Sequence, residues 1–281
     1  IPVFPPESLS QVLYTGQKCR IMANNVIPAA DGKIISGENK VLQRVDGRKW
    51  DEIRPITITP NFQKHAEGSA LIQMGATKVI CAASLEERVP GFLRGQGKGW
   101  VTAEYDMLPR STSTRNSRDR DSGRPSGRSQ EIQRLIGRAL RAVTDLDALG
   151  ERTVQIDCDV LEADGGTRTA SITGAYVALY QALDMLVKQR ILPRVPLRSA
   201  VAAISVGIVD GGCLLDLCYQ EDFGAQADFN VVITDRGEVV ELQGAAEAEP
   251  FPRQRVDQVL SLASAGVEPL FRAQRQAISS F

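Results

Sequence analysis

Hydrophobic and polar residues alternate in short stretches from Arg54 onward, as they do in half-buried strands. Residues 54–62 alternate around Ile56 and Ile58 and predict one such strand. Two further β-rich runs, 69–75 and 77–84, lie on either side of Gly75-Ala76, and this arrangement predicts a β-hairpin.

A helical spacing of apolar residues appears at 131–149 and predicts one amphipathic helix that ends near Gly150. A strand is expected at 153–163, and a second helix at 169–189 follows a break at Gly165-Gly166. Two more hairpins are predicted with turns at Asp210-Gly211-Gly212 and Asp235-Arg236-Gly237, and a terminal helix is expected at 253–276. Grouped strands followed by helices predict an α+β fold with sheet and helix layers.

From Phe92 to Arg128 the chain shows no periodicity and is rich in glycine, serine, threonine and arginine. The stretch is too long and polar for an ordinary connection, so a functional loop or a disordered segment is expected. Its last part holds the arginines Arg110, Arg115, Arg118, Arg120, Arg124 and Arg128. A solvated linker explains such a run, but guanidinium groups also suit phosphate oxygens.

Composition adds little to this picture. Of the 281 residues, 43% are apolar and 24% charged, as in ordinary globular proteins, and the net charge of −1 requires any nucleic-acid surface to be local. Five cysteines without a CxxC pair predict reduced thiols in a cytoplasmic protein, and the single His65 makes a zinc site unexpected. No apolar run approaches the roughly 20 residues of a membrane span, so no membrane contact is expected.

Residues 1–43 show neither a signal nor a transit pattern. The chain begins with Ile1, and Met22 offers an internal start. We expect an irregular, artefactual extension over residues 1–43, followed by a single functional domain over residues 44–281.

The run Asp164-Gly165-Gly166-Thr167-Arg168-Thr169 lies where the strand pattern changes to a helix pattern. Unpaired N–H groups at a helix start, two threonine hydroxyls and a guanidinium would together bind an anion. A plain Gly-Gly turn with a threonine cap fits the same residues equally well. The glycines match neither a Walker loop nor a GxGxxG turn, so a nucleotide cradle of those kinds is not indicated.

A cluster of carboxylates occupies a short strand-loop-strand stretch: Asp216, Glu221, Asp222 and Asp228. Two such groups can hold Mg²⁺ or share acid–base work, although acidic residues also simply solubilise a hairpin. His65, the only histidine, is more often a structural group than a base. With an anion site, carboxylates and arginines but no histidine or cysteine base indicated, phosphate itself is a natural nucleophile for attack on a phosphodiester.

Most of the chain from Asp46 to Ala277 resembles the bacterial ribonuclease PH family. The resemblance rests on long runs, among them DGRKWDEIRPITIT, KHAEGSALIQMGATKVICAASLEE, VPGFLRGQGKGWVTAEYDMLPRSTSTRN and LDALGERTVQIDCDVLEADGGTRTASITGAYVAL. It implies two similar βαβ-type halves in one compact domain and a homo-hexamer built as a trimer of dimers. It also implies phosphate-dependent trimming of tRNA 3′ ends that releases nucleoside diphosphates.

The resemblance also implies roles for individual residues. Inorganic phosphate is expected at Arg128, Gly166, Thr167 and Arg168, and RNA at Arg110, Arg115 and Arg118. Catalysis is assigned to Asp222 and Asp228, and a divalent metal, Mg²⁺, to the same pair with Asp216 close by.

Departures from the family pattern are few: Asp106 replaces a small residue, and the loop before Arg128 differs but keeps that arginine. The main alternative is a non-catalytic RNA-binding ring subunit of an exosome-like assembly. A fragment of polynucleotide phosphorylase would require a second DGGTRT run, which is absent from the sequence.

Overall fold

The computed structural model describes residues 27–28, 34–35, 41–42, 44–118, 126–247 and 249–281. A five-stranded sheet has the order β4 (Ile56–Pro60), β5 (Gly68–Met74), β6 (Thr77–Glu86), β8 (Thr153–Glu162), β7 (Trp100–Met107). Only β7 and β8 run parallel, and the chain crosses between them through α1 (Gly127–Val143) and α2 (Leu146–Leu149). A 3₁₀ turn at Gly91–Leu93 precedes β7.

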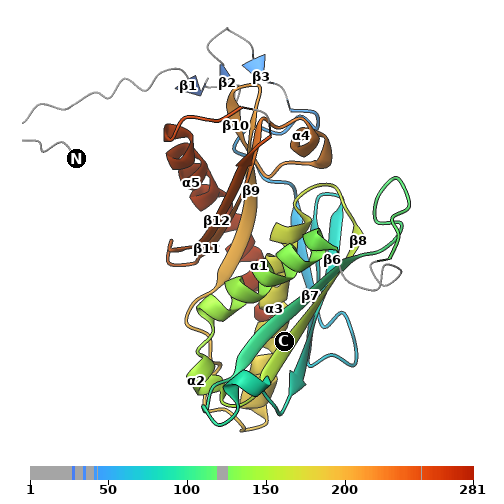
Figure 1. Cartoon of the computed structure of the whole chain (residues 1–281), viewed down its shortest axis with the longest axis vertical. Helices are drawn as coiled ribbons and strands as arrows, with labels where there is room; N and C mark the ends of the chain where they lie inside the picture. The colour runs from blue at the N-terminus through green and yellow to red at the C-terminus, as the bar shows by residue number, and fades with distance from the viewer. Residues whose placement is uncertain (1–26, 29–33, 36–40, 43, 119–125, 248) are drawn as a thin grey trace, which may run out of the picture.

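The second sheet has four antiparallel strands in the order β10 (Gly212–Leu215), β9 (Val201–Val209), β11 (Ala227–Thr234), β12 (Val239–Ala246). The short helix α4 (Tyr219–Phe223) joins β10 to β11, and α5 (Gln254–Gly266) and α6 (Glu268–Ile278) end the chain. Figure 1 shows this sheet in the upper half of the molecule and the five-stranded sheet below it. The α+β expectation is confirmed.

Helix α3 (Thr167–Lys188) connects the two sheets, because it packs on β5 and β6 of one sheet and on β9 of the other. By length and composition alone, this helix is apolar enough to cross a membrane. However, 72% of its most apolar window is buried in the protein, as in a core helix. One continuous apolar core includes residues of both sheets and of α3.

All three predicted hairpins are confirmed, with β5–β6, β9–β10 and β11–β12 paired antiparallel. The turn at Asp210-Gly211 uses two residues with positive φ, 47° and 76°, which suits the twist of a tight hairpin.

Three expectations for the chain after residue 43 were wrong. Strand β7 lies inside the stretch predicted to be irregular, where Val101, Ala103 and Tyr105 alternate with polar residues. The helix predicted at 131–149 divides at Thr144, which is extended and forms an isolated bridge with Leu197. The terminal helix divides at Val267, and Pro269 lies in the first turn of α6.

The N-terminal extension is not wholly irregular, because β1 (Ile27–Pro28), β2 (Ile34–Ile35) and β3 (Val41–Leu42) form a small antiparallel sheet. The rest of residues 1–43, including Met22 and Cys19, lies outside the described residues. The other four cysteines are free and buried, as predicted.

Candidate functional site

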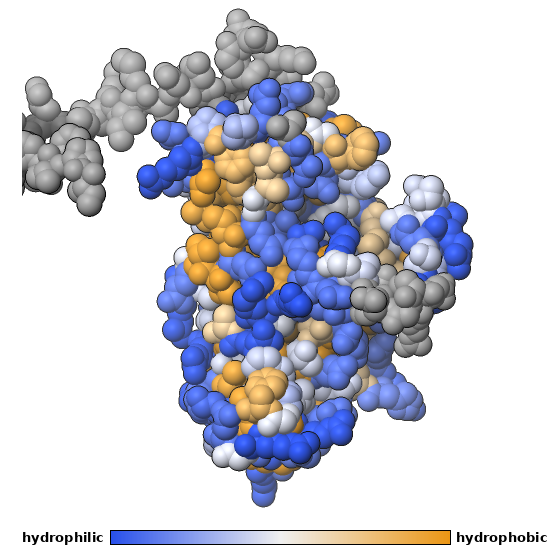
Figure 2. All heavy atoms as spheres, in the orientation of Figure 1, coloured by the Kyte–Doolittle hydropathy of each residue, from blue (hydrophilic) through white to orange (hydrophobic). Residues whose placement is uncertain are grey.

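A cavity of about 450 Å³ is lined by the starts of α1 and α3 and by residues of α4, β9, β11 and β12. It contains most of the predicted site residues. Its lining includes the predicted Arg128, Gly166, Thr167, Arg168, Asp222 and Asp228. Figure 2 shows a mostly hydrophilic surface between α4, which carries Asp222, and the start of α1, which carries Arg128. His65 is not among the lining residues.

The phosphate-site residues come from the starts of two helices. Ser126 caps α1 by accepting a hydrogen bond from the Ser129 N–H, and Arg128 follows in the first turn. Helix α3 begins after Gly166, whose φ of 64° is left-handed, and no side chain of the described residues caps it. The first N–H groups of α3 therefore stay available to an anion, since the helix itself leaves them unpaired.

Two contacts hold the side chains of this helix start. The Thr167 hydroxyl lies 2.8 Å from the hydroxyl of Tyr105 on β7, and both residues are buried. Arg168 donates through Nη1 to Glu131 at 3.2 Å and to Gln243 at 3.3 Å. Burial raises the pKa of Tyr105, while the hydrogen bond with Thr167 and the charges of Arg128 and Arg168 act against that shift.

The carboxylate side of the cavity comes from α4 and β11. Burial, and after it the charge of Asp228, raises the pKa of Asp222, while Arg128 and Arg168 oppose the shift. The two carboxylates and the two guanidinium groups therefore act on one another within one cavity. This arrangement neutralises added negative charge on one side and places an acid on the other.

Asp216 is not part of the cavity lining and is fully buried. Its Oδ1 accepts from Arg54, and its Oδ2 accepts from Arg54 and Arg48. A carboxylate whose oxygens are already occupied by two guanidinium groups has little left for a metal ion. This geometry argues against the metal role expected for Asp216.

The predicted RNA-binding arginines lie elsewhere. Arg110, Arg115 and Arg118 are exposed on the segment that follows β7 and do not line the cavity. Arg118 is close enough to Asp159 to act against the upward shift of its pKa, which burial and then Asp106 produce. Asp106 lies beside Asp159 in the parallel β7–β8 pair and so belongs to the sheet face rather than to the cavity.

Several lining residues were missed by sequence reasoning: Glu131, Ser205, Asn230, Gln243 and Glu247. One signal was available for Asn230, because it stands two residues after Asp228 and so shares its face of β11. Register then places Ser205 of β9 and Gln243 of β12 opposite Asn230. That pairing between distant strands is not readable from the sequence.

Two models of one protein family match the chain. Residues 52–183 match domain 1 of the 3′ exoribonuclease family, and residues 199–266 match domain 2. We call residues 52–183 the first half and residues 199–266 the second half of the chain.

Close relatives and solved structures cover most of the chain. It is 59% identical over 234 residues to a ribonuclease PH of Dehalococcoides mccartyi, covering 83% of this chain and 97% of that protein. Another strain's ribonuclease PH is 60% identical over 233 residues, 83% and 98% of the two chains. A chain of the Archaeoglobus fulgidus exosome with RNA bound to the active site has a TM-score of 0.70 at 23% identity, covering 82% of this chain and 92% of that one. A chain of an archaeal exosome core gives 0.65 at 22%, covering 83% and 91%. At this identity the solved structures support the fold alone, whereas the relatives in sequence show that the chain belongs to the ribonuclease PH family.

Proposed function

We propose that the cavity between the two halves is the active site of a phosphate-dependent 3′-to-5′ exoribonuclease. The chain is an exoribonuclease of the ribonuclease PH family, a tRNA nucleotidyltransferase that trims the 3′ ends of tRNA precursors and releases nucleoside 5′-diphosphates. The observation that carries the site assignment is the meeting of Arg128, Thr167 and Arg168 with Asp222 and Asp228 in one cavity.

The reaction needs no nucleophile from the protein. An oxygen of inorganic phosphate attacks the phosphorus of the terminal phosphodiester and forms a P–O–P bond. The bond from that phosphorus to the 3′-oxygen of the preceding nucleotide breaks, and this oxygen takes up a proton. The protein's task is then to hold both phosphorus centres in line and to balance their charge.

We assign the attacking phosphate to Arg128, the N–H groups after Gly166, and the side chains of Thr167 and Arg168. The helix start adds partial positive charge, and a guanidinium binds two phosphate oxygens at once. We assign the proton donor to Asp222, because burial and the charge of Asp228 raise its pKa and so keep its protonated form populated at higher pH.

We further propose that the Asp222–Asp228 pair holds Mg²⁺ through its ionised carboxylate oxygens. Mg²⁺ is commonly bound by one or two carboxylates together with substrate phosphates and water. Within the described part of the chain, no group of three acidic, histidine or cysteine side chains is placed to hold a metal. Two protein ligands completed by phosphate and water fit this site, and the ion would supply neutralisation of phosphate charge.

RNA is the partner that the family implies, and we propose that Arg110, Arg115 and Arg118 contact its backbone, since all three are exposed on one segment. We also propose a homo-hexamer built as a trimer of dimers in the cytoplasm. Four free cysteines support a reducing compartment. Light scattering of the purified chain measures the assembly, and a monomeric mass would contradict it.

One assay tests the function. The protein is incubated with a tRNA that carries a short 3′ extension, with Mg²⁺, in the presence and absence of phosphate. Nucleoside diphosphates that form only with phosphate are the expected product. Nucleoside monophosphates, or no product, would contradict the proposal, and RNA binding without product would favour the non-catalytic ring subunit.

A further inference from the structure

The two sides of the cavity belong to different halves of the chain, and their backbones come into close contact beside it. The turn Asp164-Gly165-Gly166, which leads into α3, lies against the segment that leads into α4. A Cβ on Gly165 would lie 2.6 Å from the carbonyl oxygen of Leu217. The Tyr219 N–H donates to Asp164 Oδ1 at 3.2 Å. This junction therefore helps to fix the position of the phosphate site relative to the carboxylates.

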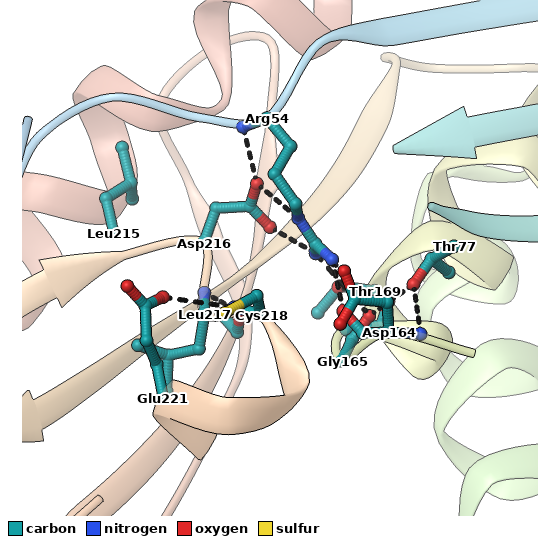
Figure 3. Close-up of polar contacts among 12 residues, drawn as sticks. Arg54, Thr77, Asp164, Gly165, Thr169, Leu215, Asp216, Leu217, Cys218 and Glu221 are labelled. Atoms are coloured by element: carbon teal, nitrogen blue, oxygen red, sulfur yellow. Dashed lines mark hydrogen bonds and ion pairs between the residues drawn. The ribbon is translucent and has the colours of Figure 1, made fainter. Parts of the chain in front are cut away.

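Arg54 lies in the junction and binds both sides of it, as Figure 3 shows. Toward the second half, its backbone N–H and its Nε donate to Asp216 Oδ2 at 2.7 and 3.0 Å. Its Nη2 donates to Asp216 Oδ1 at 2.6 Å, which completes a bidentate pair. Toward the turn, Nη1 donates to the carbonyl oxygen of Asp164, and both terminal nitrogens lie 3.4 Å from that of Gly165.

Burial makes this pair consequential. Arg54 is 3% exposed and Asp216 is fully buried, so the buried charge of Arg54 depends on Asp216 for compensation. Burial alone would lower the pKa of Arg54, but the hydrogen bond and charge of Asp216 outweigh it and the net shift is upward. Arg54 therefore stays charged, and the geometry of its pair with Asp216 is well defined because the guanidinium donates to both carboxylate oxygens.

The carbonyls that Arg54 holds fix the direction of the N–H groups that follow. A trans peptide unit is planar, so its N–H points opposite to its C=O. When Arg54 draws the carbonyls of Asp164 and Gly165 toward itself, the N–H groups of Gly165 and Gly166 must point away from it. Gly166 lines the cavity, and it is the last residue before α3.

Thr77 holds the same turn from the side of the first sheet. Its hydroxyl accepts from the Asp164 N–H at 2.9 Å and donates to the Gly165 carbonyl at 2.8 Å. The turn is thus bonded by a guanidinium on one side and by a buried hydroxyl on the other. Neither Arg54 nor Thr77 lines the cavity.

We propose that Arg54 is a positioning residue for the attacking phosphate, acting with Asp216 to hold the Asp164-Gly165-Gly166 turn at the correct distance from Asp222 and Asp228. This proposal rests on the proposed function. In this proposal the Arg54–Asp216 pair keeps the phosphate site of the first half in place relative to the carboxylates of the second half. Arg54 itself touches no substrate.

Arg54→Lys in the full chain is the direct test, because lysine keeps the charge but loses the bidentate fork and the reach to both carbonyls. We expect the KM for phosphate to rise roughly 10- to 100-fold, as small misplacements of a binding group do. RNA affinity measured without phosphate should stay at the wild-type value. The rise in thermal midpoint that phosphate causes in the wild type should be lost.

Two further variants separate positioning from simple destabilisation. Thr77→Val removes both hydrogen bonds to the turn without touching Asp216, and we expect it to raise the KM for phosphate as well. Arg141→Lys is the matched control, because Arg141 also donates to a backbone carbonyl, that of Val101 at 2.7 Å, but stands in the last turn of α1. It should lower the thermal midpoint and leave the KM for phosphate unchanged.

The outcomes decide the proposal even if one variant does not fold. The proposal is wrong if folded Arg54→Lys keeps both the wild-type KM for phosphate and the wild-type stabilisation by phosphate. If Arg54→Lys does not fold, the same result in Thr77→Val contradicts the proposal. The proposal is also wrong if Arg141→Lys raises the KM for phosphate as much as Arg54→Lys does. If the wild-type protein forms no nucleoside diphosphates, the proposed function is wrong instead. The rise in thermal midpoint that phosphate causes would then be the measurement that tests the role of Arg54 at the turn.

Discussion

The hydroxyl oxygens of Tyr105 and Thr167 lie 2.8 Å apart, so the parallel strand β7 supports the first residue of α3 from beneath. Thr167 lines the cavity, whereas Tyr105 is almost fully buried in the core. A core residue thereby sets the orientation of a proposed phosphate ligand.

Tyr105→Phe tests this support. Removing one hydroxyl from a buried pair costs about 1 kcal/mol, and we expect the KM for phosphate to rise roughly fivefold for the same reason. Tyr180→Phe, on a later turn of α3, is the matched control. An unchanged phosphate KM in Tyr105→Phe would show that Thr167 needs no support from β7.

Asp222→Asn separates activity from stability. Because burial and Asp228 raise the pKa of Asp222, the folded protein keeps its proton at a pH where the unfolded chain has released it. Ionised Asp222 therefore costs stability at neutral pH, and the amide should raise the thermal midpoint there. The gain should vanish as the pH falls below about 4, the ordinary range of an aspartate.

Activity of the same variant should fall by roughly 100-fold or more if Asp222 donates the proton. Asp51→Asn, on an exposed turn, serves as the control for the amide substitution. A midpoint that does not rise at neutral pH would contradict the electrostatic account, and full activity would contradict the role in proton transfer.

Arg168 is expected to bind the attacking phosphate rather than RNA. Loss of a charged hydrogen bond of about 1.5–3 kcal/mol predicts a KM for phosphate that rises roughly 10- to 100-fold in Arg168→Ala. Arg128→Ala should behave in the same way. Arg168→Lys should recover part of the loss, since lysine keeps the charge without the planar fork. Weakened RNA binding with a normal phosphate KM would move this arginine to the RNA.

The Mg²⁺ requirement distinguishes Asp228 from Asp216. Asp228→Asn should raise the Mg²⁺ concentration for half-maximal activity, because one of two proposed ligands is lost. Asp216→Asn should leave that concentration unchanged but lower the free energy of unfolding by about 3–5 kcal/mol, since Arg54 would be left as an uncompensated buried charge. An altered Mg²⁺ dependence in Asp216→Asn would restore it as a metal ligand.

Local patterns decided much of this protein. The alternation around Gly75-Ala76 and the Asp-Gly turns predicted three hairpins, because a strand's period and a turn's backbone needs are properties of neighbouring residues. The Gly165-Gly166 break predicted the start of α3 for the same reason. The long runs shared with the ribonuclease PH family identified the cavity residues from both halves.

Tertiary structure decided what local sequence leaves open. Strand β7 lies in a stretch that is polar overall, and only the tertiary structure shows its parallel pairing with β8 and its packing against α1. Asp216 and Asp222 stand six residues apart in one acidic stretch, and the metal ion was expected at Asp222 and Asp228 with Asp216 close by. Burial against Arg54 made the first a structural ion, and exposure to the cavity left the second for chemistry. The charge state and the task of a carboxylate depend on which groups surround it in space, and the sequence states only which groups exist.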